Sequence, residues 1–276
     1  MQPADIAKRL AGGGRVQEVT RQANRVFRIW TSDGNVSLVK VYSSPSHERR
    51  ERRALEALQG IEGVPQVVER GSEEDMSWIR FDDPGTWSLA NLPESPGAAR
   101  RAGQVLHAVH RANPELLSNL AGGMDAEWLA SDFRSTFERL GRYRRRLQIP
   151  PELLGKALRV DPPPCGEPRA AHTNPRPESF LVDETGAVTL IDWEWATLAP
   201  PEWDFSLAIW LLRVEAGPGA AAALAEGYGA VLSEADLDAW IAYHAGMILL
   251  REAETRDGRL DSLSYMVDEL RRVLSH

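Results

Sequence analysis

The sequence has a single cysteine, Cys165, among its 276 residues. Two cysteines are needed for an internal disulfide, so a disulfide framework is excluded and a reducing compartment is indicated. Apolar runs such as Leu207–Leu212 are far shorter than the roughly 20 residues that span a bilayer. Residues Met1–Asp5 also lack the basic stretch and apolar run of a signal peptide. We therefore expect a cytoplasmic protein without a membrane segment.

Positive charge is also in short supply. The chain has 32 lysines and arginines against 40 aspartates and glutamates, which gives a net charge of −8. This balance disfavours nucleic acid as the main partner and suits a cationic substrate. An arginine cluster over 139–146 is either a solvated helix face or a contact for an acidic partner. The acid-rich helices of the last fifth are likewise either solvated or able to hold a cation.

The first 83 residues are dominated by short segments typical of strands. A helix is expected over 4–11, and it ends at a run of three glycines. β-Branched and aromatic residues predict strands over 15–20, 26–31, 36–42, 64–70 and 76–81. Gly34 marks a hairpin turn at 32–35, and Ser46 is placed to cap a helix over 47–59. This pattern predicts a small sheet with one inserted helix.

The stretch Asp82–Gly85 interrupts this pattern and predicts a hinge. Beyond it a helical spacing of apolar residues dominates. Helices are expected over 98–111, 126–148, 150–160, 203–215, 218–230, 234–255 and 260–274. A β-hairpin over 180–191 interrupts them. The predicted architecture is therefore α/β (α+β), with a sheet-rich lobe over 1–83 and a mainly helical lobe over 84–276.

One loop and one hairpin of the second lobe gather the polar residues of chemical interest. The loop reads His172-Thr-Asn-Pro-Arg-Pro-Glu-Ser179, and the hairpin after it ends in Ile191-Asp192-Trp193. A carboxylate at the end of a buried strand is costly unless it is paired or bound to a metal. These segments resemble the catalytic loop and metal-binding strand of the aminoglycoside phosphotransferase and choline kinase family, which are relatives of protein kinases.

Further segments match this family in the right order along most of the chain. Val39-Lys40-Val41-Tyr42 resembles its lysine strand, and residues 50–58 resemble the helix that supplies a partner glutamate. Residues 106–110 and 199–206 resemble two segments of its second lobe. The resemblance implies a bilobal, protein-kinase-like fold. It also implies transfer of the terminal phosphate of ATP or GTP, with Mg²⁺, to a hydroxyl group.

The resemblance assigns roles to individual residues. Lys40 would hold the nucleotide phosphates, and Glu51 would fix Lys40 in place. Glu48, almost one helical turn away, is the rival partner. Asp192 would bind the Mg²⁺ that bridges the phosphates, and Ser179 would be a second metal ligand.

Three positions depart from the family pattern. Asn174 stands where the family has an aspartate, and a neutral amide can orient a hydroxyl group but cannot act as a base near neutral pH. The loss of a general base typically costs about 10²–10⁴ in rate. Ser179 replaces a metal-binding asparagine with a shorter side chain, although adjacent Glu178 could compensate. The turn over 21–24 lacks the family's glycines, so its backbone cannot approach phosphates as freely.

Three explanations fit these departures. The chain is a natural pseudokinase, an active variant with a rearranged metal site, or a protein in which Asn174 was engineered from aspartate. The last leaves Ser179 unexplained. The first functional hypothesis is a phosphotransferase that acts on a hydroxyl of a small molecule, such as an antibiotic or other natural product. Its alternatives are a kinase-like enzyme acting on peptide serine or threonine, and a non-catalytic binding or scaffold subunit with a protein partner.

Overall fold

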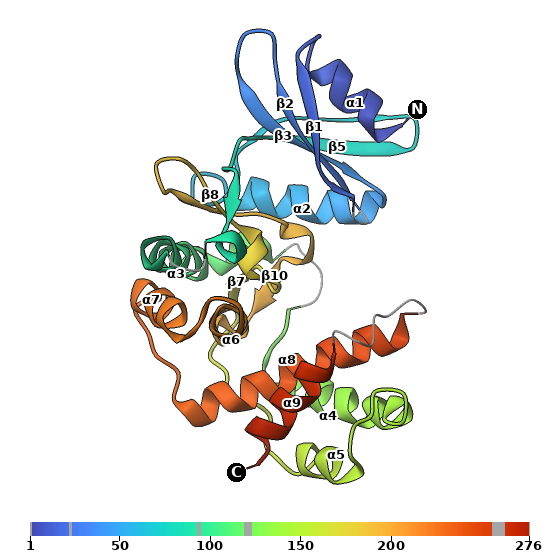
Figure 1. The fold of residues 1–276 in the computed structure, drawn as a ribbon, viewed down its shortest axis with the longest axis vertical. Helices are drawn as coiled ribbons and strands as arrows, with labels where there is room; N and C mark the ends of the chain where they lie inside the picture. Colours follow the sequence, from blue (N-terminus) through green and yellow to red (C-terminus); the bar gives the residue numbers. More distant parts are fainter. Residues whose placement is uncertain (1, 22–23, 93–94, 119–122, 256–262, 276) are drawn as a thin grey trace.

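The computed structural model describes residues 2–21, 24–92, 95–118, 123–255 and 263–275. It has a small lobe built on an antiparallel sheet and a larger helical lobe, as predicted (Figure 1). The chain passes from the first to the second just after the sheet's last residue, Asp82. That residues 82–85 act as a hinge stays a prediction.

The small lobe contains a five-stranded antiparallel sheet with the order β1-β2-β3-β5-β4. Its strands are β1 (Arg15–Arg21), β2 (Arg25–Trp30), β3 (Val36–Tyr42), β4 (Val67–Glu73) and β5 (Met76–Asp82). Gly34, with φ of 89°, lies in the predicted turn between β2 and β3. The register places Lys40 of the middle strand beside Val26 on one side and Ile79 on the other.

Two helices accompany this sheet (Figure 1). Helix α1 (Pro3–Leu10) buries Ile6 against Phe27 and Trp78 in a small separate core. Helix α2 (Pro45–Ala57) lies between the sheet and the second lobe, and it buries Glu51 and Leu55. This position lets α2 carry a side chain toward both lobes at once.

The larger lobe consists of helices with two small sheets inserted. Its helices are α3 (Pro96–His110), α4 (Ala126–Tyr143), α5 (Pro151–Ala157), α6 (Pro201–Ala216), α7 (Pro218–Tyr228), α8 (Glu234–Glu254) and α9 (Ser264–Val273). One sheet has the order β6-β8-β9, from Trp87–Ser88, Phe180–Val182 and Val188–Leu190. The other pairs β7 (Arg169–Ala171) with β10 (Thr197–Ala199). Single-turn helices η1 to η4 span Leu89–Asn91, Pro114–Leu117, Pro177–Ser179 and Trp193–Trp195.

The main apolar core runs across both lobes. Leu55 of α2 and Ile79 of β5 belong to the same buried cluster as Leu106 of α3 and Trp210 of α6. The lobes are therefore joined by packed side chains as well as by the chain itself. Within the described residues, none of the helices combines the length and apolar character that crossing a membrane requires.

Several element boundaries differ from the sequence-based expectation. Helix α2 starts at Pro45 after Ser44, so Ser46 lies inside its first turn and is not its cap. Proline suits the first helical position because no N–H is needed there. Strand β4 starts at Val67, three residues later than expected, after Pro65, which has no N–H for a strand ladder. Helix α4 ends at Tyr143, five residues before the predicted end. The start of the helix expected over 260–274 falls outside the described residues.

Candidate functional site

Lys40 and Glu51 form a buried ion pair between the sheet and α2. Lys40 Nζ lies 2.7 Å from Glu51 Oε2, and the residues are 6% and 2% exposed. The Tyr42 hydroxyl donates to the same oxygen at 2.9 Å, and the backbone N–H of Trp193 donates to Glu51 Oε1 at 3.2 Å. Both oxygens of Glu51 are therefore satisfied, as a buried carboxylate requires.

Asp192 joins this pair from the second lobe. It directly follows Ile191 after β9 and has φ of 77° and ψ of 53°, a left-handed conformation that non-glycine residues seldom adopt. Its carboxylate contacts Lys40 Nζ. Burial, the largest single influence, raises the pKa of Asp192, but the charge and the hydrogen bond of Lys40, together with smaller contributions, outweigh it and leave that pKa lowered. Burial lowers the pKa of Lys40, and the surrounding carboxylates reverse this and raise it. Both groups are therefore charged at neutral pH.

Glu194 brings a third carboxylate to Lys40. Its Oε2 lies 3.5 Å from Lys40 Nζ and accepts a hydrogen bond from Asn24 Nδ2 at 2.6 Å. Glu51, Asp192 and Glu194 each place one oxygen within 4.8 Å of the others. Neither Glu194 nor Asn24 was predicted as a site residue from the sequence. The one local signal was that Glu194 follows Asp192 by two residues, in the single turn η4.

Asp204 of α6 fixes the loop that begins at His172. It accepts the N–H groups of His172 and Thr173, each at 2.7 Å. The His172 ring contacts the Ile191 carbonyl through Nε2 at 2.8 Å and the Asn174 N–H through Nδ1 at 3.3 Å. A carbonyl only accepts and an N–H only donates, so this ring is neutral with its proton on Nε2. Burial, the largest influence, lowers the pKa of His172. His172 thus ties the loop to the strand before Asp192.

The side chain of Asn174 is held by Arg176. Arg176 Nε lies 3.1 Å from Asn174 Oδ1. A guanidinium has donors only, so the atom that faces it must be the amide oxygen. That oxygen is the atom of Asn174 that could accept a hydrogen bond from an acceptor hydroxyl. In this conformation one of its lone pairs is therefore already used.

Ser179 lies at the end of the same loop. Its N–H donates to the Arg176 carbonyl at 2.9 Å, and its own carbonyl accepts the Ile191 N–H at 2.9 Å. Ser179 is 7% exposed, whereas neighbouring Glu178 is exposed. Both residues line the same cleft as Asp192. The loop and the strand are thus joined by a backbone hydrogen bond next to the carboxylate cluster.

A cleft of about 480 Å³ lies between the lobes and contains the Lys40 cluster. Val26 and Leu38 line it from the sheet, and Leu181 and Ile191 line it from the hairpin of the second lobe. The cleft therefore has apolar walls along its length and an ion-pair cluster in which Lys40 is the cation. Such a shape suits a flat apolar group joined to an anionic tail.

The model of the phosphotransferase enzyme family (APH) matches residues 16–243, which include every residue that lines the cleft. The chain belongs to this family. No curated protein matches the chain in a sequence comparison. The bilobal, kinase-like fold inferred from the motifs is therefore confirmed.

Solved structures of this phosphotransferase family share the fold. The aminoglycoside phosphotransferase APH(4)-Ia, in a complex with ADP and hygromycin B, superposes with a TM-score of 0.71 at 14% identity, covering 100% of this chain and 98% of that one. The macrolide 2′-phosphotransferase MphH from Brachybacterium faecium gives 0.66 at 18% identity, covering 96% and 95%. A GDP complex of an aminoglycoside 2′-phosphotransferase of type IIIa gives 0.71 at 15% identity, covering 95% and 91%. At these identities the likeness concerns the fold alone.

Four of the five predicted site residues of this phosphotransferase-family chain line the same cleft. Lys40, Glu51, Asp192 and Ser179 line one cleft, and Asn174 belongs to the adjoining loop. The rival Glu48 pairs instead with Arg52 at 3.1 Å along α2. The glycine-free turn falls partly on residues 22–23, outside the described residues. The functional role of each residue stays a prediction.

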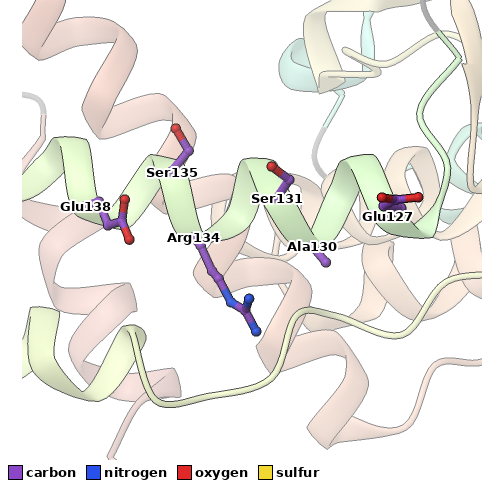
Figure 2. Close-up of a pocket in the computed structure, with 6 residues that line it drawn as sticks. All are labelled: Glu127, Ala130, Ser131, Arg134, Ser135 and Glu138. Atoms are coloured by element: carbon purple, nitrogen blue, oxygen red, sulfur yellow. The ribbon is translucent and has the colours of Figure 1, made fainter.

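A second hollow, of about 460 Å³, follows one face of α4 (Figure 2). Figure 2 shows its lining on successive turns of that single helix, with Ser131 and Ser135 pointing to one side and Arg134 to the other. Glu127 and Glu138 mark its two ends and are exposed. None of these residues belongs to the motif segments. The hollow fits a solvated helix face better than a reaction site.

Proposed function

We propose that this family member binds a nucleoside triphosphate in the interlobe cleft and transfers its terminal phosphoryl group to a hydroxyl of a small molecule. The observation that carries the proposal is Lys40, buried at the cleft and held by carboxylates from both lobes. A lysine fixed in this way presents a positive charge to a phosphate without the entropy cost of ordering it. The ADP and GDP complexes of the structural neighbours support a nucleotide as donor.

Mg²⁺ fits the donor set of the site. Carboxylate oxygens are ligands that Mg²⁺ prefers, and three carboxylates surround the single ammonium of Lys40. Since both oxygens of Glu51 are used by the protein, Asp192 and Glu194 are the better ligands. We expect the Ser179 hydroxyl to assist. Bound Mg²⁺ would neutralise charge on the phosphates.

The reaction needs an acceptor hydroxyl in line with the terminal phosphorus. The acceptor oxygen bonds to that phosphorus as the bond to the bridging oxygen breaks, and the nucleoside diphosphate leaves. Asn174 can orient the hydroxyl but cannot take its proton, which therefore passes to water or to a phosphate oxygen. Because such transition states are usually loose, orientation matters more than base strength. We therefore propose a slow enzyme in which Asn174 positions the acceptor.

A non-catalytic binding protein is the second candidate. It is favoured by the contact of Arg176 with Asn174 Oδ1, which occupies the atom that would orient an acceptor. Such a protein would bind nucleotide in the cleft and act through a protein partner. Transfer to a peptide serine or threonine uses the same chemistry as the first candidate and differs in the acceptor alone.

Calorimetric titration with ADP and GDP, with and without Mg²⁺, tests the nucleotide site. Phosphoryl transfer from ATP or GTP labelled in the terminal phosphate, to water, aminoglycosides, macrolides and a serine peptide, tests the reaction. We expect Mg²⁺-dependent binding and slow transfer. Asn174→Asp should raise the rate by about 10²–10⁴ because it restores a base.

The matched control is Asn113→Asp, since Asn113 does not line the cleft and caps the single turn η2 by accepting the Glu115 N–H at 3.1 Å. This control should leave the transfer rate unchanged. Absence of nucleotide binding would reject the proposed function. Binding without transfer, even in Asn174→Asp, would favour the non-catalytic candidate.

A further inference from the structure

Arg176 lies two residues beyond Asn174 in the same loop, and the backbone holds it there. Its N–H donates to the Asn174 carbonyl at 2.9 Å, and its carbonyl accepts the Ser179 N–H at 2.9 Å. Pro175 and Pro177 flank it, and the ring of each proline fixes φ at its own position. The side chain is half-buried, and its Nε–H donates to Asn174 Oδ1 at 3.1 Å. The guanidinium therefore has a fixed place next to the residue proposed to position the acceptor.

The terminal nitrogen atoms of this guanidinium are free to bind a ligand. Among the described residues, Nη1 and Nη2 of Arg176 have no hydrogen-bond or ion-pair partner, and both are accessible to solvent. The same holds for the amide nitrogen of Asn174, since its amide oxygen is the atom that faces Arg176. The atoms of the two side chains that have no partner are thus all nitrogen donors. Such a set suits a ligand group that only accepts hydrogen bonds.

The positive charge of Arg176 is not neutralised by a direct contact. Glu178 and Glu215 are the acidic side chains of this region, and neither forms an ion pair with Arg176 in the described part of the chain. Glu178 is exposed, so water screens its charge. Burial and the charge of Glu178 raise the pKa of Glu215 to about 7, so Glu215 is only partly ionised at neutral pH. An aspartate at position 174 would neutralise Arg176, whereas the amide of Asn174 leaves its charge available.

We infer that Arg176 binds a carboxylate of the acceptor molecule, so that the substrate is a hydroxy acid; this rests on the proposed function. A carboxylate has two coplanar oxygens, which match the paired N–H groups at Nη1 and Nη2. Its single negative charge suits one guanidinium with acidic neighbours better than the nearly double charge of a phosphate group does. The net charge of −8 suits a cationic substrate, but the donors beside Asn174 have the opposite preference.

Phosphoryl transfer from terminally labelled ATP and GTP, with Mg²⁺, to matched alcohols tests this inference. The acids are 3-hydroxypropionate and 4-hydroxybutyrate. Each is compared with its own amide and with the amino alcohol of the same chain length, which share the primary hydroxyl and differ in charge. We expect kcat/KM for each acid to exceed that for its amide by roughly 10- to 150-fold, because the amide lacks the charge that Arg176 binds.

Arg176→Gln should remove the preference for acids over their amides. Because this preference is a ratio within one protein, an effect of the substitution on Asn174 itself cancels. Arg176→Lys keeps the charge without the fork and should retain part of the preference. Asn174→Asp should raise KM for the acids, since its carboxylate neutralises Arg176, while it raises the rate at saturation. Arg101→Gln is the matched control, because Arg101 donates to the Gly186 carbonyl at 2.9 Å and does not line the cleft; it should keep the preference.

Equal transfer to acids and amides, or a preference for the amino alcohols, would overturn the inference and leave the proposed function standing. A preference for acids that survives in Arg176→Gln would do the same. Transfer to none of these alcohols by a protein that binds nucleotide in the calorimeter would also overturn the inference alone. Failure of nucleotide to bind would overturn both. The comparison of acid with amide in the wild-type protein decides even where Arg176→Gln does not fold.

Discussion

At the level of single residues, the Lys40 cluster contributes both to the stability of the fold and to the proposed binding of nucleotide. Lys40 is buried and charged, and the carboxylate of Glu51 beneath it is more buried still. A buried charge is tolerated when it is paired and hydrogen-bonded, and removing one partner leaves the other uncompensated. A single substitution in this pair would therefore destabilise the fold as well as alter nucleotide binding, so the two effects need a double variant to separate them.

We expect Lys40→Met to abolish tight nucleotide binding and to lower the free energy of unfolding by about 3–5 kcal/mol, because Glu51 is left buried without its cation. Adding Glu51→Gln should restore most of the stability without restoring nucleotide binding. Urea denaturation of both variants measures this. Lys156→Met, at an exposed position of α5, is the control and should change stability by no more than about 0.5 kcal/mol. A double variant as unstable as the single one would contradict the argument.

The sequence predicted those contacts of the site whose partners lie close along the chain. Lys40 and Glu51 are 11 residues apart, so the strand and the helix after it already suggested the pair. Asn24 and Glu194 are 170 residues apart, and their contact depends on how two lobes meet. Arg176 was missed for another reason. Its contact with Asn174 is local, but the loop backbone that creates it has no sequence periodicity to reveal it.

At the level of elements, helices α3 and α7 approach each other closely. A Cβ added to Gly103 of α3 would lie 2.1 Å from the Leu224 carbonyl oxygen, and one added to Gly227 of α7 would lie 1.8 Å from the Arg100 carbonyl oxygen. Both obstacles are backbone atoms, which cannot move aside as a flexible side chain can. The two glycines therefore set the distance between these helices. Apolar periodicity predicted both helices but could not reveal how closely they approach.

We expect Gly103→Ala to lower the free energy of unfolding by about 1–3 kcal/mol, since the added methyl group must push the helices apart. Gly97→Ala, in the first turn of the same helix, meets no atom within 4 Å. It should instead be neutral or stabilise the protein by up to about 1 kcal/mol, because alanine restricts the unfolded chain. Thermal and urea denaturation of the two variants compare them directly. Equal effects of both substitutions would show that close packing of α3 and α7 does not matter.

At the level of the whole molecule, polar contacts close the lobes around the cleft. Asn24, just before β2, donates to Glu194 of η4, and its Oδ1 accepts the Ser43 backbone N–H at 3.2 Å. Lys40 reaches Asp192 across the same gap. The Gly63 carbonyl of the small lobe also accepts the Leu190 N–H of β9 at 2.8 Å. Opening the cleft for nucleotide exchange would break the contacts of Asn24 and Lys40 that cross it.

We therefore expect Asn24→Ala to weaken closure of the lobes while leaving each lobe folded. A hydrogen bond to a charged group contributes about 1.5–3 kcal/mol, so the open form should become roughly 10- to 150-fold more populated. Nucleotide should then dissociate faster, and backbone amides beside the cleft should exchange faster in hydrogen-exchange measurements. Asn35→Ala removes an exposed turn contact with Asp33 and should alter neither rate. If Asn24→Ala leaves both rates unchanged, the contact between Asn24 and Glu194 does not hold the lobes together, and closure depends on Lys40 and the shared apolar core.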